Sequence, residues 1–162
     1  MKKFLSFLLV LGILTLSMAP ASVKASAAEE SNVYQVGEYI FTVTDYKNNE
    51  ISTLSYTTTH TTGVNITDTS GNYIATVYMK TTWEYQDGSY VRCIACYSPT
   101  YTPTTYPLTY GNAEYYTASP YHTTVSRPMI FAISPTQMSF YLNITCDTYG
   151  DVTSSVTSSR PF

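Results

Sequence analysis

The chain has few basic residues, few histidines and few cysteines, and each shortage narrows the possible functions. Eight Lys and Arg residues stand against eleven Asp and Glu among 162 residues, with two His, three Cys and one Trp. The basic residues beyond position 27 are scattered singly, whereas phosphate recognition depends on clustered Lys and Arg. The sequence therefore predicts that the protein binds no nucleic acid.

Long apolar runs are also missing, except for one at the N-terminus. Two lysines precede an apolar stretch over residues 4–19. At about 16 residues this stretch is shorter than the roughly 20 that a membrane-spanning helix needs. The small residues Ala25, Ser26 and Ala27 suit a signal-peptidase site. We predict a signal peptide over residues 1–27, with cleavage after Ala28 as the near alternative, and no stable membrane insertion afterwards.

The signal sets the expected location and charge. Its style resembles the export signals of Gram-positive bacteria, so we expect a secreted, extracellular product. Three of the eight basic residues lie within the signal, so residues 28–162 keep five basic against eleven acidic side chains, a formal charge of −6. The length of this remainder fits one domain.

Residues 28–162 are rich in tyrosine and threonine and lack helical periodicity. All seventeen tyrosines follow the cleavage site, and both residue types favour strands. Apolar residues recur instead with a period of two, most clearly over residues 73–85. The sequence predicts a single all-β domain, an antiparallel β-sandwich of about seven to nine short strands. The expected strands span residues 36–44, 51–59, 64–67, 73–85, 89–97, 129–134, 138–146 and 152–157.

The stretch from Gly71 to Gly88 reads GNYIATVYMKTTWEYQDG. Its alternating strand ends in an aromatic residue, a short acidic turn and glycine. In this it resembles a hairpin of small, functionally uncharacterised secreted β-rich proteins of Firmicutes. The resemblance implies export and β-structure, and it carries no activity.

The three cysteines leave at least one thiol without a partner in the chain. Cys93 and Cys96 have the spacing of a redox or zinc motif, but residues three apart in a regular strand point to opposite faces. We therefore predict no metal site and no cofactor. Cys146 lies on the expected inward face of its strand.

Which cysteine meets Cys146 depends on the hairpin after residue 85. A three-residue loop over 86–88 places Thr81 opposite Cys93 and turns Val91, Cys93, Ala95 and Tyr97 inward, whereas a two-residue loop over 87–88 pairs Met79 with Cys96. We favour the first, which predicts a disulfide between Cys93 and Cys146. Three reduced, buried cysteines are the alternative.

Catalytic motifs are missing too. His60 lies in a threonine run and His122 follows Pro120 and Tyr121, and nothing around either resembles a nucleophile motif. We predict no catalytic residue. The alternatives are a small secreted hydrolase with Asp or Glu beside His60 or His122, and a secreted toxin or inhibitor.

The segment over residues 98–121 departs from ordinary strand chemistry. Its four prolines predict loop or edge structure at the surface. Exposed tyrosine offers broad amphipathic contact at a small cost in rotamer entropy. We predict a non-catalytic extracellular binding module that contacts glycan or protein at a cell surface; the alternative is that these rings fold back over the sandwich edge. The candidate ligand-binding residues are Tyr101, Tyr106, Tyr110, Tyr115, Tyr116 and Tyr121.

Overall fold

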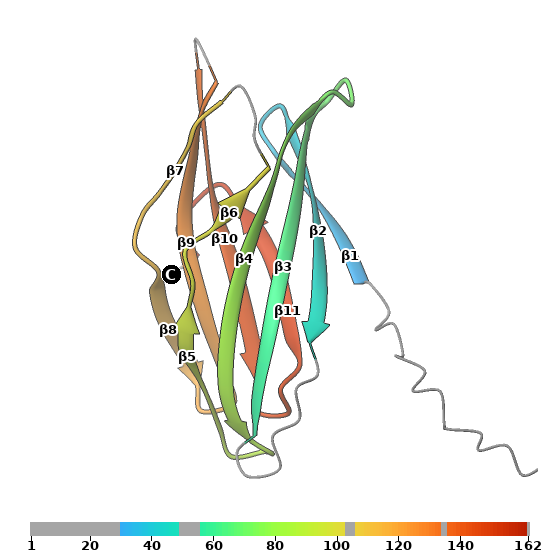
Figure 1. The fold of residues 1–162 in the computed structure, drawn as a ribbon. Coiled ribbons are helices and arrows are strands. Elements are labelled where there is room, and N and C mark those ends of the chain that lie inside the picture. The colour runs from blue at the N-terminus through green and yellow to red at the C-terminus, as the bar shows by residue number, and fades with distance from the viewer. Residues whose placement is uncertain (1–29, 49–55, 103–105, 134–135, 162) are drawn as a thin grey trace, which may run out of the picture.

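The computed structural model describes four ranges of the chain, which are residues 30–48, 56–102, 106–133 and 136–161. The predicted signal peptide over residues 1–27 lies outside these ranges, as does most of the predicted strand 51–59. Within them the chain forms eleven strands and no helix, which confirms the predicted all-β sandwich (Figure 1). The described residues thus include no helix of the length and apolarity that a membrane span requires.

The strands form two antiparallel sheets. They are β1 (Glu30–Val36), β2 (Tyr39–Asn48), β3 (Thr57–Asp68), β4 (Tyr73–Gln86), β5 (Tyr90–Cys96), β6 (Thr100–Tyr101), β7 (Leu108–Tyr110), β8 (Glu114–Ser119), β9 (His122–Ile133), β10 (Thr136–Asp147) and β11 (Val152–Thr157). The first sheet has the order β1-β2-β3-β4-β5, and β6 also pairs with β4. The second has the order β11-β10-β9-β7, and β8 also pairs with β9.

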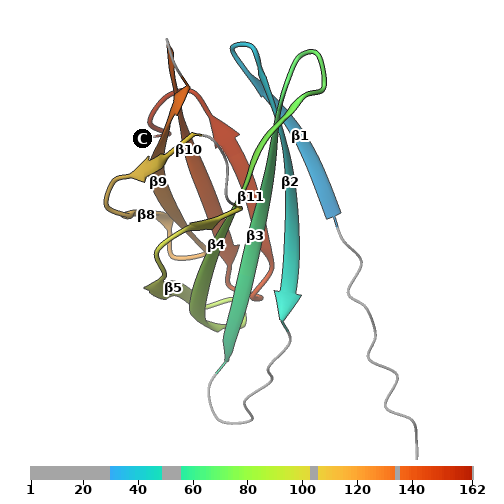
Figure 2. The same ribbon diagram turned by 45° about the horizontal axis from the view of Figure 1, so that its top comes forward.

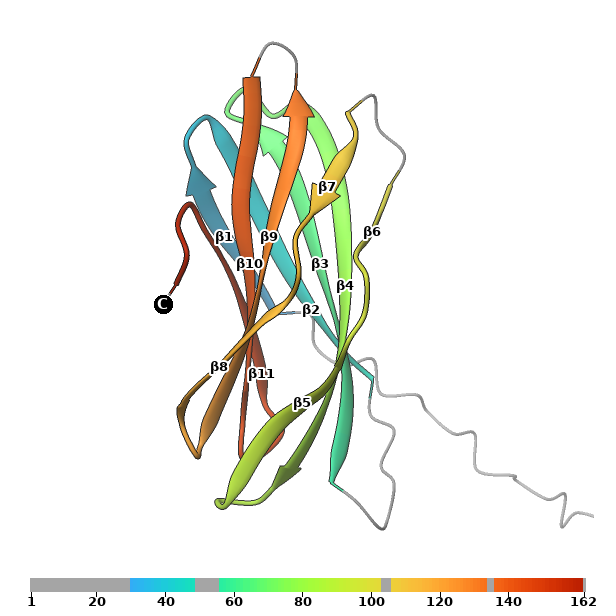
Figure 3. The same cartoon turned by 90° about the vertical axis from the view of Figure 1, so that its left-hand side faces the viewer.

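The two sheets pack face to face. Figure 2 shows them as two layers, with β1 to β3 in one and β9 to β11 in the other. At one edge β1 and β2 contact β11, and toward the other edge β5 contacts β9 and β10. Figure 3 shows the short strands β6, β7 and β8 on the side where β5 lies. The proline-rich segment therefore supplies edge strands, as its composition predicts.

The described strands outnumber the predicted seven to nine. β1 was not predicted, because its polar residues Ser31, Asn32 and Gln35 hide the alternation. β3 spans the gap between two predicted strands, and the segment over 98–121 contributes three short strands where loop or edge structure was expected. The bounds of β11 agree with the prediction, since its flanking turn residues are clear.

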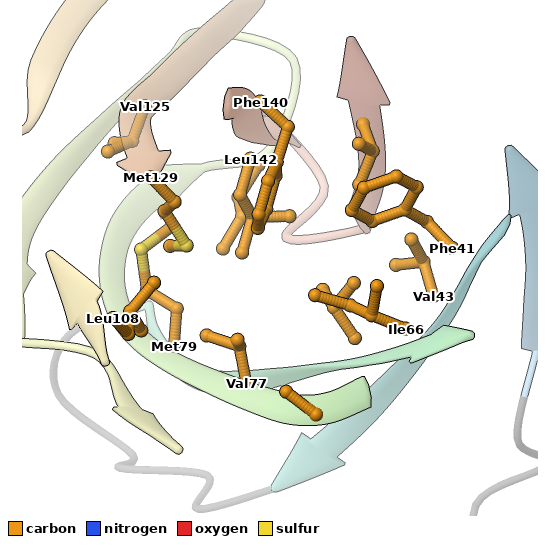
Figure 4. Close-up of a cluster of buried hydrophobic side chains, with 14 of the residues drawn as sticks. Phe41, Val43, Ile66, Val77, Met79, Leu108, Val125, Met129, Phe140 and Leu142 are labelled. Atoms are coloured by element: carbon orange, nitrogen blue, oxygen red, sulfur yellow. The ribbon is translucent and has the colours of Figure 1, made fainter. Parts of the chain in front are cut away.

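The core lies between the sheets, and β4 supplies its largest side chain. The predicted inward residues of β4 are fully buried except for Tyr85, which is half-buried; the fully buried ones are Ala75, Val77, Met79, Thr81 and Trp83. Phe41 of the first sheet contacts Phe140 of the second, with ring centroids 4.8 Å apart (Figure 4). Each such large apolar side chain contributes about 1.5–3 kcal/mol when fully buried, so this layer holds the sheets together.

The hairpin between β4 and β5 differs from both predicted registers. Gln86 pairs with Tyr90, so the loop covers residues 87–89, one residue later than the favoured three-residue loop. Gly88, the middle residue of this loop, has a φ of 64°, a left-handed conformation that glycine adopts readily. The shift leaves the alternation unchanged as far as Cys93, which faces inward as predicted.

Pro128 divides the outer edge of β9. Proline has no N–H to donate to a neighbouring strand. Its carbonyl instead accepts a hydrogen bond from the backbone N–H of Gly111 at 3.0 Å. A Cβ on Gly111 would lie 2.7 Å from the proline ring, so only glycine fits there. β7 pairs with β9 on one side of this point and β8 on the other.

Two hairpin turns share one design, over residues 68–72 and 147–151. In each, the carboxylate of the first residue accepts hydrogen bonds from the backbone N–H groups two and four residues later, at 2.8–2.9 Å. The fourth residue is a left-handed glycine, with φ of 84° at Gly71 and 79° at Gly150. The turns differ in their surroundings, because only Gly150 lies against the ring of Tyr85.

We expect Gly150→Ala to lower the free energy of unfolding more than Gly71→Ala does. Both substitutions place a Cβ in left-handed backbone, which costs about 1–2 kcal/mol. At Gly71 the new Cβ meets nothing within 4 Å, whereas at Gly150 it lies 2.5 Å from the Tyr85 ring, and overpacking adds about 1–3 kcal/mol. Urea denaturation of the two variants measures the difference. Equal losses would contradict this contact between the sheets.

Candidate functional site

Five of the six candidate tyrosines lie at the surface. They are between 39% and 56% exposed, namely Tyr101, Tyr110, Tyr115, Tyr116 and Tyr121. Tyr106 instead packs half-buried against the core. The alternative, in which the rings fold back over the sandwich, therefore describes Tyr106 and, in part, Tyr101, whose ring lies edge-on to Phe131 at 6.3 Å.

Three of these tyrosines come from the neighbouring edge strands β7 and β8. Tyr110 pairs with Met129 and Tyr115 pairs with Val125, both of which are buried core residues. Paired residues point to the same side of a sheet, so both tyrosines lie on the inward side, at an edge where solvent still reaches them. Tyr116 points to the outer face.

An interior arginine lies beside the inward-facing tyrosines. Arg127 of β9 belongs to the inward row and is 8% exposed. Its Nη1 donates to the backbone carbonyl of Tyr97 at 3.0 Å, and its guanidinium carbon lies 5.4 Å from the centroid of the Tyr110 ring. Its Nε is buried without a hydrogen-bond partner, and no carboxylate in the described ranges forms an ion pair with it. A buried guanidinium without a counter-ion is unusual.

Electrostatics link this arginine to the cysteines of β5. Burial raises the pKa of Tyr115, the nearby Cys96 and Cys93 thiols raise it further, and Arg127 opposes them. Arg127 Nη1 and Cys96 Sγ both lie near the carbonyl oxygen of Tyr97, at 3.0 Å and 4.0 Å, so the guanidinium lies beside the end of β5. We call Tyr110, Tyr115, Tyr116 and Arg127 the tyrosine–arginine edge.

Arg127 is the member of this site that the sequence analysis missed, because it counted only as one of several scattered basic residues. A signal for it exists. Val125, Arg127, Met129 and Phe131 alternate along β9, and all four are buried. A charged residue at an inward position of an alternating strand indicates a site that needs a charge.

A β-bulge in β5 changes the arrangement predicted for its cysteines. Cys93 pairs with Trp83 and Ala95 pairs with Thr82, so Ile94 has no partner on β4 and the alternation reverses there. Cys96 then pairs with Thr81, which is inward-facing and fully buried. Cys93 and Cys96 therefore share the inward side, and the expectation of opposite faces is wrong. For the same reason Ala95 and Tyr97, which were predicted to face inward, point outward.

All three cysteines are thiols in the described structure. The Cys93 thiol donates to the carbonyl of Ala95 at 3.2 Å, and the Cys146 thiol donates to the carbonyl of Asp147 at 3.5 Å. Cys93 and Cys146 both face the interior, as the predicted disulfide requires, but no bond joins them here.

His60 meets a carboxylate and two hydroxyls in a buried cluster. Asp45 of β2 accepts hydrogen bonds on a single oxygen, Oδ1, from three groups: His60 Nε2 at 3.0 Å, Thr62 Oγ1 at 2.9 Å and Ser154 Oγ at 2.6 Å. Ser154 belongs to β11, so the cluster ties the two sheets together. Burial raises the pKa of Asp45, but the hydrogen bonds from His60, Ser154 and Thr62 outweigh it and leave this pKa below its ordinary value.

This cluster has the residue types of a hydrolase triad in a different arrangement. A catalytic histidine stands between the acid and the nucleophilic hydroxyl. Here Asp45 stands between His60 and the hydroxyl of Ser154, and His60 is only 3% exposed. His60 Nδ1 is buried without a partner. The other histidine, His122, is exposed at the first position of β9. The geometry of the cluster favours a structural link over catalysis.

No protein-family model, no curated protein and no solved structure matches the chain. The resemblance to secreted Firmicutes proteins therefore stays a prediction, and the function is argued from the geometry.

We expect Asp45→Asn to destabilise the protein at neutral pH and to matter less in acid. Since the pKa of Asp45 is lowered by folding, its contribution is fully present above the unfolded pKa of about 3.9 and is lost as the pH falls through the folded pKa. Loss of charge-assisted hydrogen bonds should reduce the unfolding free energy by about 1.5–3 kcal/mol at pH 7.

Urea denaturation between pH 7 and pH 2.5 measures this gap between the wild type and Asp45→Asn. Asp87→Asn, which alters an exposed turn carboxylate, is the control. Its free energy of unfolding should stay close to that of the wild type at every pH. A gap for Asp45→Asn that stays constant into acid would show that the charge of this residue is irrelevant.

A thiol count decides the disulfide question. Denatured residues 28–162, titrated with a thiol reagent and no reductant, should react at three positions, because each thiol has its own local acceptor or neighbour in the structure. A single reactive thiol would instead show that two of the three cysteines are joined, and proteolytic mapping of the bond would then show whether the pair is Cys93 and Cys146.

Proposed function

We propose that the protein is a secreted, non-catalytic binding module whose tyrosine–arginine edge contacts a glycan at a cell surface. The observation that carries this proposal is the exposure of the adjacent Tyr115 and Tyr116 on a short edge strand. Burial in the core does not account for either ring. Both present broad aromatic surface to solvent at neighbouring positions.

The outer face beside Tyr116 favours a glycan over a protein partner. Tyr116 begins a row across four strands that continues with Thr124, Thr145 and Thr153. Thr124 and Thr145 are joined by a hydrogen bond between their hydroxyls at 2.8 Å. Tyrosine rings pack against the C–H faces of sugars, while hydroxyls hydrogen-bond sugar hydroxyls. An uncharged row with one ring at its end suits such a ligand.

On the inward side of the same edge, the rings of Tyr110 and Tyr115 lie on the opposite side of the sheet from Tyr116. Tyr110 and Tyr115 lie on the side of the sheet that faces β5, and Arg127 orders Tyr110 through its cation–π contact. Rings held on short strands lose little freedom on binding, which favours affinity. The polysaccharide would thus run along the edge and contact rings on both sides of β8.

Replacing Tyr115 and Tyr116 together with Ala should weaken retention on insoluble cell-wall polysaccharide at least about tenfold, which corresponds to roughly 1.4 kcal/mol. Both rings are exposed, so the melting curve should barely change. Tyr73→Ala is the matched control, because Tyr73 is 52% exposed but begins β4 in the other sheet.

Co-sedimentation of residues 28–162 with purified polysaccharide measures retention, and a parallel assay on protein-stripped cell envelopes separates the two ligand classes. Binding that disappears when envelope proteins are removed would indicate a protein partner instead. Equal retention of the double variant and the wild type would contradict any role for this edge.

A further inference from the structure

The inward sulfurs of β4 and β5 form a group that the proposed function does not use. The bulge at Ile94 places Cys93 opposite Trp83 and Cys96 opposite Thr81, on the same side of the sheet. Both cysteines are half-buried and pack against the core. Cys96 Sγ lies 4.0 Å from Sδ of Met79, the next inward residue of β4. The sulfurs of Cys96 and Met79 are thus neighbours, and Cys93 lies on the same side of the sheet at the next inward position of β5.

The spacing of the two cysteines suits a bridging metal ion better than a disulfide. The partners of the two cysteines, Trp83 and Thr81, are alternate residues of β4 and lie roughly 6.5–7 Å apart, whereas a disulfide needs Cβ atoms about 3.5–4.5 Å apart. A metal ion about 2.3 Å from each sulfur holds the two sulfurs up to about 4.6 Å apart when it lies between them.

The ligand atoms indicate which metal ion. Thiolate and thioether sulfurs select copper(I) among the common metals. Structural zinc takes four ligands, and the part of the chain that the structure describes has no group of three His, Cys, Asp or Glu residues placed for one ion. Two thiolates with one thioether complete the shell of a soft monovalent ion and leave a zinc ion short of ligands.

The positive charge of Arg127 also favours a monovalent metal ion over a divalent one. Arg127 Nη1 donates to the carbonyl oxygen of Tyr97 at 3.0 Å, and Cys96 Sγ lies 4.0 Å from the same oxygen, so the guanidinium lies beside this sulfur. A monovalent ion with two thiolates has a net charge of −1, and the Arg127 guanidinium has no carboxylate partner in the described ranges. A divalent ion would leave that guanidinium unbalanced.

We propose that Cys93 and Cys96, with Met79 as a weaker third ligand, form a binding site for a soft monovalent metal ion of the copper(I) class, whose charge is balanced by Arg127. Binding breaks two S–H bonds, forms two thiolate–metal bonds and one weaker thioether–metal bond, and releases two protons to solvent, with no change of oxidation state. The bulge at Ile94 is the structural cause, because it alone brings the two thiols to one side.

The test is an anaerobic titration of reduced residues 28–162 with copper(I) in competition with a chromophoric copper(I) chelator, repeated with redox-inert silver(I). The wild type should bind a single equivalent. Cys93→Ser and Cys96→Ser should each weaken binding by at least the roughly 10–100-fold that loss of a supporting group causes, and Met79→Leu should weaken it less.

Cys146→Ser is the matched control, since it removes an interior thiol that belongs to β10, and it should leave the affinity unchanged. Circular dichroism of each metal-free variant verifies folding, and X-ray absorption of the silver(I) form should show only sulfur neighbours. Unchanged affinity in both Cys93→Ser and Cys96→Ser, an equal loss in Cys146→Ser, or tighter binding of zinc(II) than of copper(I) would each overturn the proposal.

Discussion

The inward face of β4 is the constraint on which the rest of the molecule depends. This strand pairs with β3, β5 and β6, and its buried row around Trp83 can face only the core. Because paired residues share a face, that orientation determines which side chains of its neighbours point inward. Thr81 lies opposite His60 on β3 and opposite Cys96 on β5. The buried acid–histidine cluster and the sulfur group therefore both take their positions from one strand.

Polar groups occupy both flanks of the interior, and the apolar layer separates them. Toward β1 and β11, Asp45 accepts hydrogen bonds from His60 and two hydroxyls, and these bonds lower its pKa. Toward β5 and β8, the partners of Arg127 within the described ranges are the carbonyl of Tyr97 and the ring of Tyr110. One oxygen of Asp45 thus accepts three hydrogen bonds, while the Arg127 guanidinium has no anionic partner among the described residues. The Asp45 cluster is therefore a structural link, whereas the region around Arg127 has a charge that a ligand could balance.

The sequence predicted what depends on local alternation and missed what depends on contacts between strands. The inward row of β4 and the bounds of β11 follow from residue order alone. The bulge at Ile94 has no local signal, because it arises where β5 must follow β4 and still pack its cysteines against the core. Likewise, Asp45 and His60 are placed together only by the pairing of β2 with β3. Of the candidate site, the exposed tyrosines were foreseen and Arg127 was not.

The break at Pro128 has a consequence for how copies of this molecule meet. A continuous strand edge is a template on which a second chain can pair and polymerise. Here β7 has three residues and β8 has six, and Gly111 closes the gap between them on the carbonyl of Pro128. An approaching strand would lose its alignment at that point. Because Pro128 lacks an N–H and interrupts this edge, it opposes self-assembly of the molecule into fibres. The aromatic side chains of the edge can therefore stay exposed without starting fibre growth.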